Sequence, residues 1–432
     1  MKYGIVGLGT TGQSVLRYLP PQQVAWAWDT RETIPLALLQ ARWPQVDFYR
    51  GALPASCWQG VDALVVSPGV SLAHPALAPA RSRPIPMIGD IELFARAVTR
   101  PVIAITGSNG KSTVTTLVAQ MLQAAGVDAA AGGNLGTPAL DLLSQDAAVY
   151  VLELSSFQLE TTSSLQARAA ALLNISADHM DRYATLSDYV AAKARIFHRA
   201  EWAVVPAQWA HLAQPAAEQV SFGLQPPQRP QDFGVVNGWL VQGERPLLQV
   251  AALKLPMAHM QLNVLAALAL VAPFGVDLSA AAQTAARFTG LPHRTQRVPS
   301  EDGIVWVNDS KGTNVGATLA ALHSFLDQGP VILVAGGVAK GQDFTPLAQA
   351  AQRCRQVILF GQDRARIAQA MEKVGLAPVV VETLTAALKA AQACARRGDV
   401  VLFSPACASF DQFANYQQRG EAFCDWVRTH AR

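Results

Sequence analysis

A glycine-rich stretch that ends in Lys-Ser-Thr, ITGSNGKST at 105–113, has the residue types of a loop that holds nucleotide phosphates. It is shorter than the usual GxxxxGK[ST] spacing, because Ile105 stands where the first glycine is expected. An apolar run precedes the stretch, and an amphipathic helical pattern begins right after Lys111. Backbone N–H groups at a helix N-terminus favour anions, and a lysine there adds a charge for the β- and γ-phosphates. An ordinary glycine turn is the alternative, but we predict a nucleotide phosphate loop formed by Gly107, Ser108, Asn109, Gly110, Lys111, Ser112 and Thr113.

Oxygen-bearing side chains near this loop are candidates for a magnesium site. Ser112 or Thr113 can offer a hydroxyl to the ion, since Mg²⁺ prefers hard oxygen ligands. Glu153 follows the apolar run VYVL, so we expect it at the carboxyl end of a strand, where ligands gather in open α/β sheets. The alternative for Glu153 is a buried strand-end acid paired with an arginine.

A second glycine motif, IVGLGTTG, lies close to the N-terminus. Gly7, Gly9 and Gly12 have the GxGxxG spacing between a predicted strand and a predicted helix, and Asp29 ends the next strand. This pattern suits a pyrophosphate that rests on the helix end, whether it belongs to NAD or to a UDP-sugar. Glycines that only allow close helix–strand packing are the remaining alternative.

Three segments of the chain alternate short apolar runs with helical patterns, which is typical of parallel sheets with crossover helices. Their strand-like runs include YGIVGLG, VAWAWD and ALVVSPG, then VIAI, VYVL and AALLNIS, and finally IVWVND, VILVAGG, QVILFG and DVVLFSP. The segment RSRPIPMIGD at 81–90 and the Gly and Pro at 290–292 mark the boundaries. We therefore predict an α/β protein with three domains, at 1–92, 93–290 and 291–432.

Composition excludes several classes of protein. The net charge is only +3 and no basic cluster stands out, which argues against a nucleic-acid partner. The most apolar long run, at 262–276, is too short to span a bilayer and contains Pro273, and the N-terminus does not read as a signal peptide. We expect a cytoplasmic protein that does not insert into membranes. The cysteines have no CxxC spacing and read as reduced thiols: Cys57, Cys354, Cys394, Cys407 and Cys424.

Motifs spread over nearly the whole chain resemble those of the Mur ligases, which join amino acids to cell-wall nucleotide precursors. They are TGSNGKST, GGNLG, LELSSFQLE, DHMDRY, AAKARIF, FTGLPHR, NDSKGTN and SPACASFDQF. The resemblance implies an N-terminal Rossmann-like domain that binds UDP, a central P-loop ATPase-type domain and a C-terminal Rossmann-like domain that binds the amino acid. It is nearest to the members that add D-glutamate to UDP-N-acetylmuramoyl-L-alanine with ATP, through an acyl phosphate, in bacterial peptidoglycan synthesis.

The resemblance also implies roles for individual residues. Glu153, His179 and Lys193 would hold magnesium with Ser112, and Lys193, which alone reads as an exposed helix lysine, would be carbamylated. The catalytic set would be Lys111, Glu153, His179, Lys193 and Lys311. The phosphate loop at 107–113 would bind ATP, which Asn263, Arg294 and Asp309 would also contact. The UDP substrate would meet Thr10, Thr11, Asp29, Thr30, Arg31, Ser67, Gly69 and Asn134, and D-glutamate would meet Thr313, Lys340, Ser409 and the backbone near Tyr416.

The chain departs from the family pattern at three places. Met260 stands in HMQLN where the family has an asparagine near the adenine, although Asn263 remains. The loop before Lys340 reads GGVAK, which is less polar than expected, and Tyr416 replaces a common phenylalanine. A nicotinamide-dependent oxidoreductase, a non-catalytic nucleotide switch and a sister ligase with another amino acid are the alternative functions. We expect a monomer.

Overall fold

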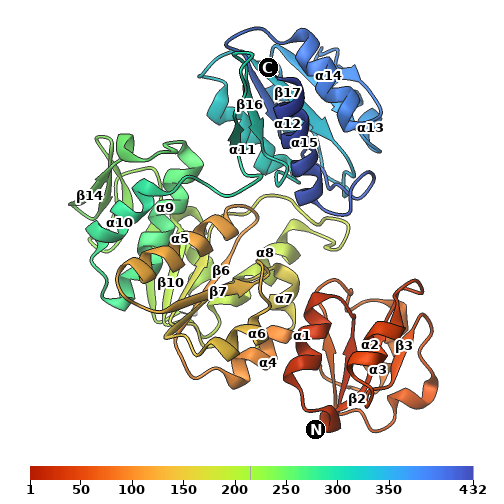
Figure 1. The fold of residues 1–432 in the computed structure, drawn as a ribbon. Coiled ribbons are helices and arrows are strands. Elements are labelled where there is room, and N and C mark those ends of the chain that lie inside the picture. The colour runs from red at the N-terminus through yellow and green to blue at the C-terminus, as the bar shows by residue number, and fades with distance from the viewer. Residues whose placement is uncertain (215, 432) are drawn as a thin grey trace. The chain divides into compact units, whose positions relative to one another are not determined.

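The structure is a computed structural model that describes residues 1–214 and 216–431, and within these ranges the strands form three sheets (Figure 1). The predicted α/β class is confirmed. Two compact units make up the chain. The first contains Met1–Asn174, Ser187–Leu253 and Gln261–Arg287, and the second contains Ile175–Leu186, Lys254–Met260 and the chain from Phe288 onward. The exact domain boundaries at 92 and 290 stay a prediction.

The N-terminal sheet carries the GxGxxG motif at the carboxyl end of its middle strand. Its parallel strands lie in the order β3-β2-β1-β4-β5. The chain passes from β1 to β2 on one side and from β4 to β5 on the other, so the carboxyl ends of β1 and β4 form a switch point where ligands gather. The indoles of Trp26 and Trp28 are buried on β2 and donate to the carbonyls of Cys57 and Gly51. The elements are β1 Tyr3–Val6, α1 Thr10–Tyr18, β2 Val24–Asp29, α2 Leu36–Arg42, β3 Phe48–Arg50, β4 Ala63–Val66, α3 Ala78–Ser82, β5 Met87–Ile88 and α4 Asp90–Ala97.

The central sheet holds the phosphate loop. Its order is β14-β13-β12-β11-β10-β9-β6-β8-β7, and β6 is buried along its whole length, as expected of a parallel strand covered on both faces. The apolar run predicted as a buried helix is α9, which ends before Pro273. The elements are β6 Val102–Thr106, α5 Lys111–Ala124, β7 Ala129–Gly133, α6 Ala139–Leu142, β8 Val149–Glu153, α7 Ser156–Glu160, β9 Ala169–Leu172, α8 Leu186–Ala194, β10 Trp202–Pro206, β11 Glu218–Phe222, β12 Phe233–Val236, β13 Trp239–Gln242, β14 Arg245–Gln249, α9 Ala258–Val271 and α10 Leu278–Arg287.

An antiparallel extension at one edge of this sheet was not predicted (Figure 1, green). Asn237 and Gly238 join β12 to β13, and both have positive φ, at 48° and 77°. Positive φ at both central residues is the requirement of a type I′ hairpin turn, and Asn-Gly is its strongest sequence signal. The Asn-Gly dipeptide at 237–238 is therefore the local sequence signal for this hairpin.

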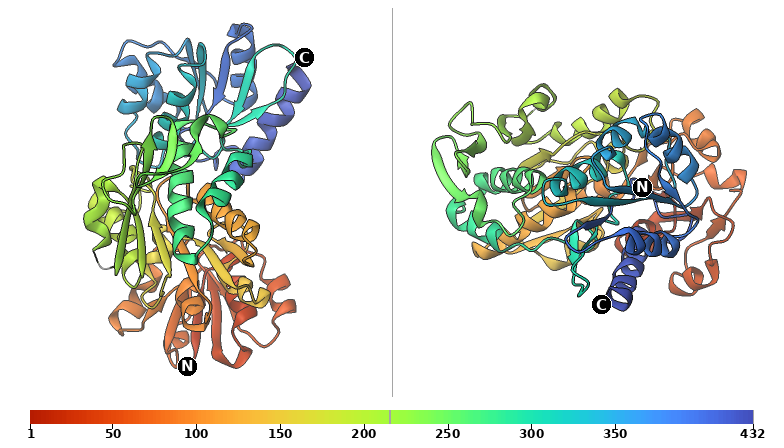
Figure 2. Two further views of the ribbon diagram at one scale, coloured as in Figure 1. Left: turned by 90° about the vertical axis from the view of Figure 1, so that its left-hand side faces the viewer. Right: turned by 90° about the horizontal axis from the view of Figure 1, so that it is seen from above.

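The C-terminal sheet confirms all four predicted strand runs and adds an antiparallel edge. Its order is β15-β16-β20-β17-β18-β19, with β15 antiparallel to β16. The core contains Trp306, Phe403 and Phe423, and the last two rings stack 4.9 Å apart. In Figure 2 the last helix, in dark blue, runs from this sheet to the C-terminus. The elements are β15 Gln296–Val298, β16 Val305–Asn308, α11 Val315–Phe325, β17 Val331–Gly336, α12 Thr345–Ala351, β18 Gln356–Phe360, α13 Arg364–Glu372, β19 Val379–Val380, α14 Leu384–Cys394, β20 Val400–Phe403 and α15 Tyr416–His430.

All five cysteines are free thiols, as predicted. Cys57, Cys407 and Cys424 are buried, and Cys354 and Cys394 are half-buried. Burial raises the pKa of Cys354 and of Cys407 to about 12. In residues 1–214 and 216–431, the helices are too short or too polar to traverse a lipid bilayer.

Helix α4 connects the N-terminal sheet to the central sheet and begins with a buried acid. Glu92 accepts hydrogen bonds from the backbone N–H groups of Ser163 and Ser164, at 2.8 and 3.0 Å, and so fastens α4 to the loop after α7. Asp90 is only 1% exposed, and burial raises its pKa to about 6. The Asp90 carboxyl group therefore binds its proton more tightly in the folded protein than in the unfolded chain.

Replacing Asp90 by asparagine should stabilise the protein near neutral pH. Because the folded pKa is raised, the wild type loses stability as the pH rises from about 4 to about 6, and the loss is complete above the folded pKa. A pKa difference of roughly two units corresponds to ~3 kcal/mol, an upper figure for the gain in Asp90→Asn above pH 7. Calorimetric melting of both proteins from pH 5 to pH 8 checks this. A difference in Tm that does not change with pH would contradict the assignment.

Candidate active site

The phosphate loop occupies the tight turn between β6 and α5. Gly110 has a φ of 83°, and a Cβ placed on it would stand 2.5 Å from Oδ1 of Asn263, so both conformation and space require glycine there. Asn263, which the resemblance assigns to ATP, is buried on α9 and packs against this glycine. Glycine at this position therefore lets the side chain of Asn263 on α9 lie directly against the backbone of the loop.

A residue that the sequence analysis missed, Asn174, holds this loop in shape. Its Oδ1 accepts from the N–H of Asn109 at 2.8 Å, and its Nδ2 donates to the carbonyl of Asn109 at 2.9 Å. The backbone carbonyl of Asn174 accepts from the N–H of Ser108 at 3.0 Å. Asn174 follows β9, the neighbour of β6, so an amide at the end of an adjacent strand was the available signal.

Lys111 is the first residue of α5, and its ammonium group folds back over the loop. Nζ donates to the carbonyls of Gly107 and Ser108, at 2.7 and 3.0 Å. The positive charge therefore lies over the turn whose backbone the phosphates of a nucleotide would approach.

Glu153 ends β8, as predicted, and is 3% exposed. Ser112 donates its hydroxyl to Oε2 of Glu153 at 2.5 Å, and Asn134 donates its amide to Oε1 at 2.6 Å. Glu153 is therefore hydrogen-bonded both to the phosphate loop, through Ser112, and to the GGNLG loop, through Asn134. Asn134, which the resemblance assigns to the UDP substrate, contacts the acid directly.

The donors collected around Glu153 fit magnesium. A carboxylate and a hydroxyl at the N-terminus of α5 are hard oxygen ligands, the kind that Mg²⁺ takes beside phosphates. In the part of the chain that the structure describes, no three His, Cys, Asp or Glu side chains cluster as a metal site. His179, the other predicted magnesium ligand of these residue types, belongs to the second compact unit, whereas Glu153 belongs to the first.

Lys193 is buried, in contrast to the exposed position that its local sequence suggested. Its side chain on α8 is 2% exposed, Nζ donates to the carbonyl of Gly107 at 2.9 Å, and the ammonium lies 4.6 Å from the ring centre of Tyr189. The hydroxyl of Tyr189 in turn lies 3.1 Å from Oγ of Ser108. The phosphate loop is therefore contacted by two lysines from different helices.

The N-terminal site brings its predicted residues to one edge of the sheet, because β1, β2 and β4 are parallel and each is followed by one of the predicted segments. A Cβ on Gly12 would stand 1.8 Å from the carbonyl oxygen of Gly7, so helix α1 can approach β1 only with glycine there. Ser67 donates to the same carbonyl at 3.1 Å. Thr10 and Thr11 form the first turn of α1, Thr30 follows β2, and Gly69 follows Ser67 beyond β4.

Asp29 closes the turn after β2 and is tied to Arg31. Its oxygens accept from the N–H of Leu8 at 2.8 Å and from the guanidinium of Arg31 at 2.8 and 2.9 Å. Burial, the largest single influence, raises the pKa of Asp29, but the hydrogen bonds from Arg31 and Leu8 together lower it below its usual value. Asp29 thus stays ionised and orients Arg31.

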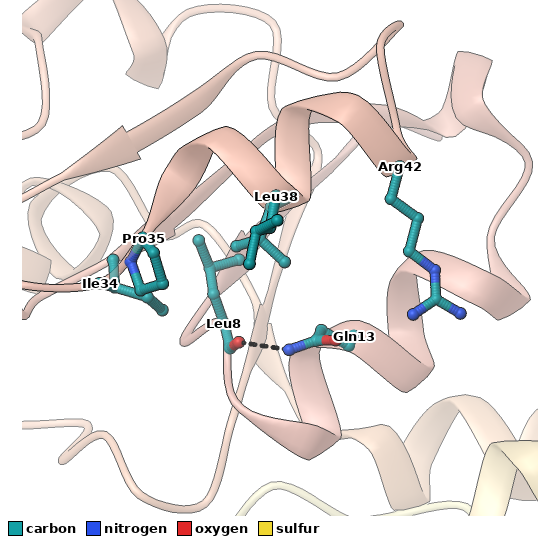
Figure 3. Close-up of a pocket in the computed structure, with 7 residues that line it drawn as sticks. Leu8, Gln13, Ile34, Pro35, Leu38 and Arg42 are labelled. Atoms are coloured by element: carbon teal, nitrogen blue, oxygen red, sulfur yellow. Dashed lines mark hydrogen bonds between the residues drawn. The ribbon is translucent and has the colours of Figure 1, made fainter.

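An apolar pocket of about 390 Å³ opens beside this turn (Figure 3). Leu8 of the glycine turn forms one wall, and Gln13 hydrogen-bonds the carbonyl of Leu8 at 3.2 Å. The opposite wall belongs to α2 and the residues before it. The lining residues are Leu8, Gln13, Ile34, Pro35, Leu38, Leu39 and Arg42.

In the second unit, the NDSKGTN loop follows β16. Asp309 accepts from the backbone N–H of Thr295 at 3.0 Å and from the hydroxyl of Ser404 at 2.6 Å. Burial raises the pKa of Asp309 to about 6, against the opposing influence of those hydrogen bonds and of Arg294. The ammonium of Lys311 lies 4.4 Å from the ring centre of Tyr416.

The DHMDRY segment lies against the predicted amino-acid residues of this unit. Asp178 is buried, accepts from the amide of Asn314 at 3.1 Å and lies 3.8 Å from Nζ of Lys340. His179 is half-buried, and its backbone N–H donates to the carboxylate of Asp178 at 2.9 Å. Sequence reasoning had singled out His179 and Lys340 but not Asp178, the acid that links them.

Ser409 and the loop of Lys340 are joined by backbone pairing. Val338 and Ala408 form an isolated antiparallel bridge, which sets Ser409 of SPACASF beside the GGVAK loop. Ser409 is buried, and Thr313 is half-buried in the loop before α11. Lys340, Ser409 and Thr313 are thus carried by adjoining loops of the C-terminal sheet.

A fully buried arginine, Arg419 on α15, supports these loops and was not found from the sequence. Its guanidinium donates to Oγ and to the carbonyl of Ser310 at 3.1 and 2.8 Å, and to the carbonyl of Cys407 at 3.1 Å. Burial lowers the pKa of Arg419 to about 10, so it remains charged at neutral pH. One cation therefore braces both the NDSKGTN and the SPACASF motifs.

Comparisons with known proteins match Mur ligase sequences along nearly the whole chain. The family model of the MurD-like N-terminal domain matches residues 1–89, that of the Mur ligase middle domain matches 105–271, and that of the Mur ligase, glutamate ligase domain, matches 293–407. The UDP-N-acetylmuramoylalanine–D-glutamate ligase of Hydrogenovibrio crunogenus is 49% identical, covering 99% of this chain and 97% of the relative. The ligase of the same name from Alcanivorax borkumensis is 47% identical, covering 97% and 96%.

Solved structures of low identity share the fold. A pseudomurein peptide ligase type C from Methanothermus fervidus has a TM-score of 0.63 at 16% identity, covering 99% of this chain and all of that one. The UDP-N-acetylmuramate-alanine ligase of Thermotoga maritima has a TM-score of 0.62 at 19% identity, covering 99% of each chain. At these identities the likeness concerns the three-domain α/β architecture.

Proposed function

Because the chain belongs to the Mur ligase family, we propose that it joins D-glutamate to UDP-N-acetylmuramoyl-L-alanine in an ATP-dependent reaction of peptidoglycan precursor synthesis. The observation that carries the proposal is near full-length identity of 46 to 49% to relatives that bear this name. The junction of Ser112, Glu153 and Asn134 supports it, because it joins the phosphate loop to the loop of a predicted substrate residue.

The reaction proceeds through an acyl phosphate. The L-alanine carboxylate of the UDP substrate attacks the γ-phosphorus of ATP, and ADP leaves. The amine of D-glutamate then attacks the acyl carbon, and the tetrahedral intermediate loses a proton and expels phosphate to leave the amide. Both steps develop negative charge, which fixed donors stabilise better than water does.

The chain's own residues supply the positive charge that compensates this negative charge, and they position the substrates. Lys111 and the backbone of the phosphate loop would bind the β- and γ-phosphates, and Lys311 would face the acyl phosphate. Asp309, Arg294 and Asn263 would contact the nucleoside part of ATP. Ser112, Glu153 and His179 would hold Mg²⁺, which neutralises phosphate charge when bound.

The two carboxylates of D-glutamate need separate donors. Lys340 and Thr313 would bind one, and Ser409 with the backbone near Tyr416 would bind the other. Asp178 would keep the Lys340 ammonium in place, since the two groups lie 3.8 Å apart. At the other substrate, Thr10, Thr11, Arg31 and the turn around Ser67 would hold UDP.

Lys193 would be carbamylated and then share in holding metal. The ammonium first loses a proton, and the neutral amine then adds CO₂ and releases a second proton, so a cation becomes an anion with two oxygen donors. Burial of Lys193 beside Gly107 supports this, because it shields the group from water.

Enzyme treated with ¹³C-bicarbonate should show a protein carbamate signal by ¹³C NMR that Lys193→Arg lacks. Lys254→Arg, at an exposed lysine, is the matched control and should keep the signal. An identical spectrum in wild type and Lys193→Arg would refute the carbamate and leave the ligase assignment standing.

The function itself is tested by phosphate release from ATP with Mg²⁺ and UDP-N-acetylmuramoyl-L-alanine, adding amino acids singly. Release that depends on D-glutamate, with a product heavier by one glutamyl residue, is the expected result. Release with another amino acid instead would make the chain a sister ligase, and no release with any amino acid would overturn the proposal. We further propose that the protein works as a monomer in the bacterial cytoplasm, where ATP and the UDP precursor are available.

A further inference from the structure

A polar contact joins the helix of the N-terminal glycine motif to the central sheet. Arg17, in the last turn of α1, donates Nη2 and Nε to the two carboxylate oxygens of Asp141 on α6, at 2.5 and 3.1 Å. The buried hydroxyl of Ser14, on the same helix, donates to Oδ1 of Asp141 at 2.9 Å. Helices α1 and α6 lie side by side, and Figure 1 shows them at the junction of the two sheets.

The other end of this connection is Glu153. Asn134 is fixed to Glu153 twice, by its N–H to the carbonyl at 2.8 Å and by its amide to Oε1 at 2.6 Å. The loop that follows is tight, since Gly133 N–H donates to the carbonyl of Thr137 at 2.8 Å and α6 begins directly after Pro138. A short, hydrogen-bonded stretch of chain therefore runs from the acid beside the phosphate loop to Asp141.

The contact is charged and specific in its geometry. Burial, the largest influence, raises the pKa of Asp141, but hydrogen bonds from Arg17 and Ser14 lower it below its usual value, so the carboxylate is ionised at neutral pH. Two parallel N–H···O bonds from one guanidinium fix direction as well as distance. The side chains of Arg17 and Asp141 are 36% and 25% exposed, and a pair this exposed adds little to the stability of the fold.

We propose that Asp141 is a positioning residue, which sets helix α1 at the angle and distance that align the UDP substrate with the phosphate loop. The inference rests on the proposed function, in which α1 holds the substrate's diphosphate and the loop holds ATP. The UDP substrate binds at the N-terminal sheet and ATP binds at the central sheet. Their reacting atoms therefore meet only if the distance and angle between these two sheets are kept. A displacement of about 1 Å at a reacting centre can lower a rate by ~10²-fold.

The test compares Asp141→Asn with the exchanged pair, Arg17→Asp combined with Asp141→Arg. In Asp141→Asn we expect kcat to fall by about tenfold or more. The KM for ATP and the affinity for UDP should stay within about twofold, because neither Arg17 nor Asp141 belongs to either predicted binding site. The exchanged pair should recover most of kcat. Asp327→Asn, which breaks the surface pair with Arg353 in the other unit, is the matched control and should behave as wild type.

Three results would overturn the inference while wild type turns over with D-glutamate. The first is a kcat of Asp141→Asn within twofold of wild type. The second is a loss of ATP affinity in Asp141→Asn by the same factor as the loss of kcat, together with a lower Tm. The third is failure of the exchanged pair to recover any activity while it melts like wild type. Wild type that shows no D-glutamate-dependent turnover would overturn the proposed function, together with the positioning role that depends on it.

Discussion

Replacing Lys111 by alanine is expected to abolish D-glutamate-dependent turnover while binding of the UDP substrate persists. The variant removes the ammonium that lies over the carbonyls of Gly107 and Ser108, and with it the fixed charge for the transferring phosphate. Loss of one such fixed donor costs on the order of 10²–10³-fold in kcat, and Lys111 serves both the binding of ATP and the phosphoryl transfer. Phosphate release and calorimetric titration of the UDP substrate measure the two effects separately.

Lys254→Ala is the matched control, because Lys254 is exposed and lies outside the predicted site. It should retain wild-type turnover. Turnover of Lys111→Ala close to that of wild type would refute the phosphate-loop assignment. Loss of UDP-substrate binding in Lys111→Ala would show instead that the substitution disturbs the N-terminal site.

Replacing Arg419 by lysine should destabilise the C-terminal unit and weaken its hold on D-glutamate. A lysine cannot reproduce the planar set of donors that reaches Ser310 and Cys407, so buried acceptors lose their partners. We expect a loss on the order of 3 kcal/mol, which lowers the Tm of a unit of this size by roughly 10 °C. The KM for D-glutamate should rise, because the loops of Lys311 and Ser409 lose their common brace.

Calorimetry and steady-state kinetics of Arg419→Lys are compared with those of Arg428→Lys. Arg428 lies on the same helix, is 62% exposed and pairs only with the nearby Asp425 among the ion pairs found in residues 1–214 and 216–431. Arg428→Lys should leave Tm and KM unchanged. Equal behaviour of the two variants would mean that the buried guanidinium is not required.

Local patterns predicted much of the fold and the places of the glycine-lysine loop and of Glu153 within it. The apolar runs became strands because parallel strands buried on both faces need continuous apolar sequence. The stretch at 105–113 placed the phosphate loop between β6 and α5, since glycine turn, lysine and helix start are neighbours in sequence. Glu153 was located by the same reasoning, from the end of the run VYVL.

Features that depend on contacts between distant residues were not predictable in this way. Lys193 reads as an exposed helix residue because its burial comes from Tyr189 and from Gly107, which is far away in the chain. Asn174 and Arg419 carry no motif of their own, and their importance is visible only through the loops that they hold. The hairpin at 237–238 differs, because its Asn-Gly signal is local and can be read from the sequence alone.

The burial of the thiols has a practical consequence for oxidation and labelling. Only the thiolate reacts quickly with peroxides and alkylating reagents, and at a pKa of about 12 the thiolates of Cys354 and Cys407 amount to roughly one part in 10⁵ at pH 7. A cysteine introduced on the surface, with a pKa of ~8.5, holds roughly three thousandfold more thiolate. Fluorophores can therefore be attached at chosen surface positions of both compact units with these two thiols left in place, and the same inertness protects them from peroxide.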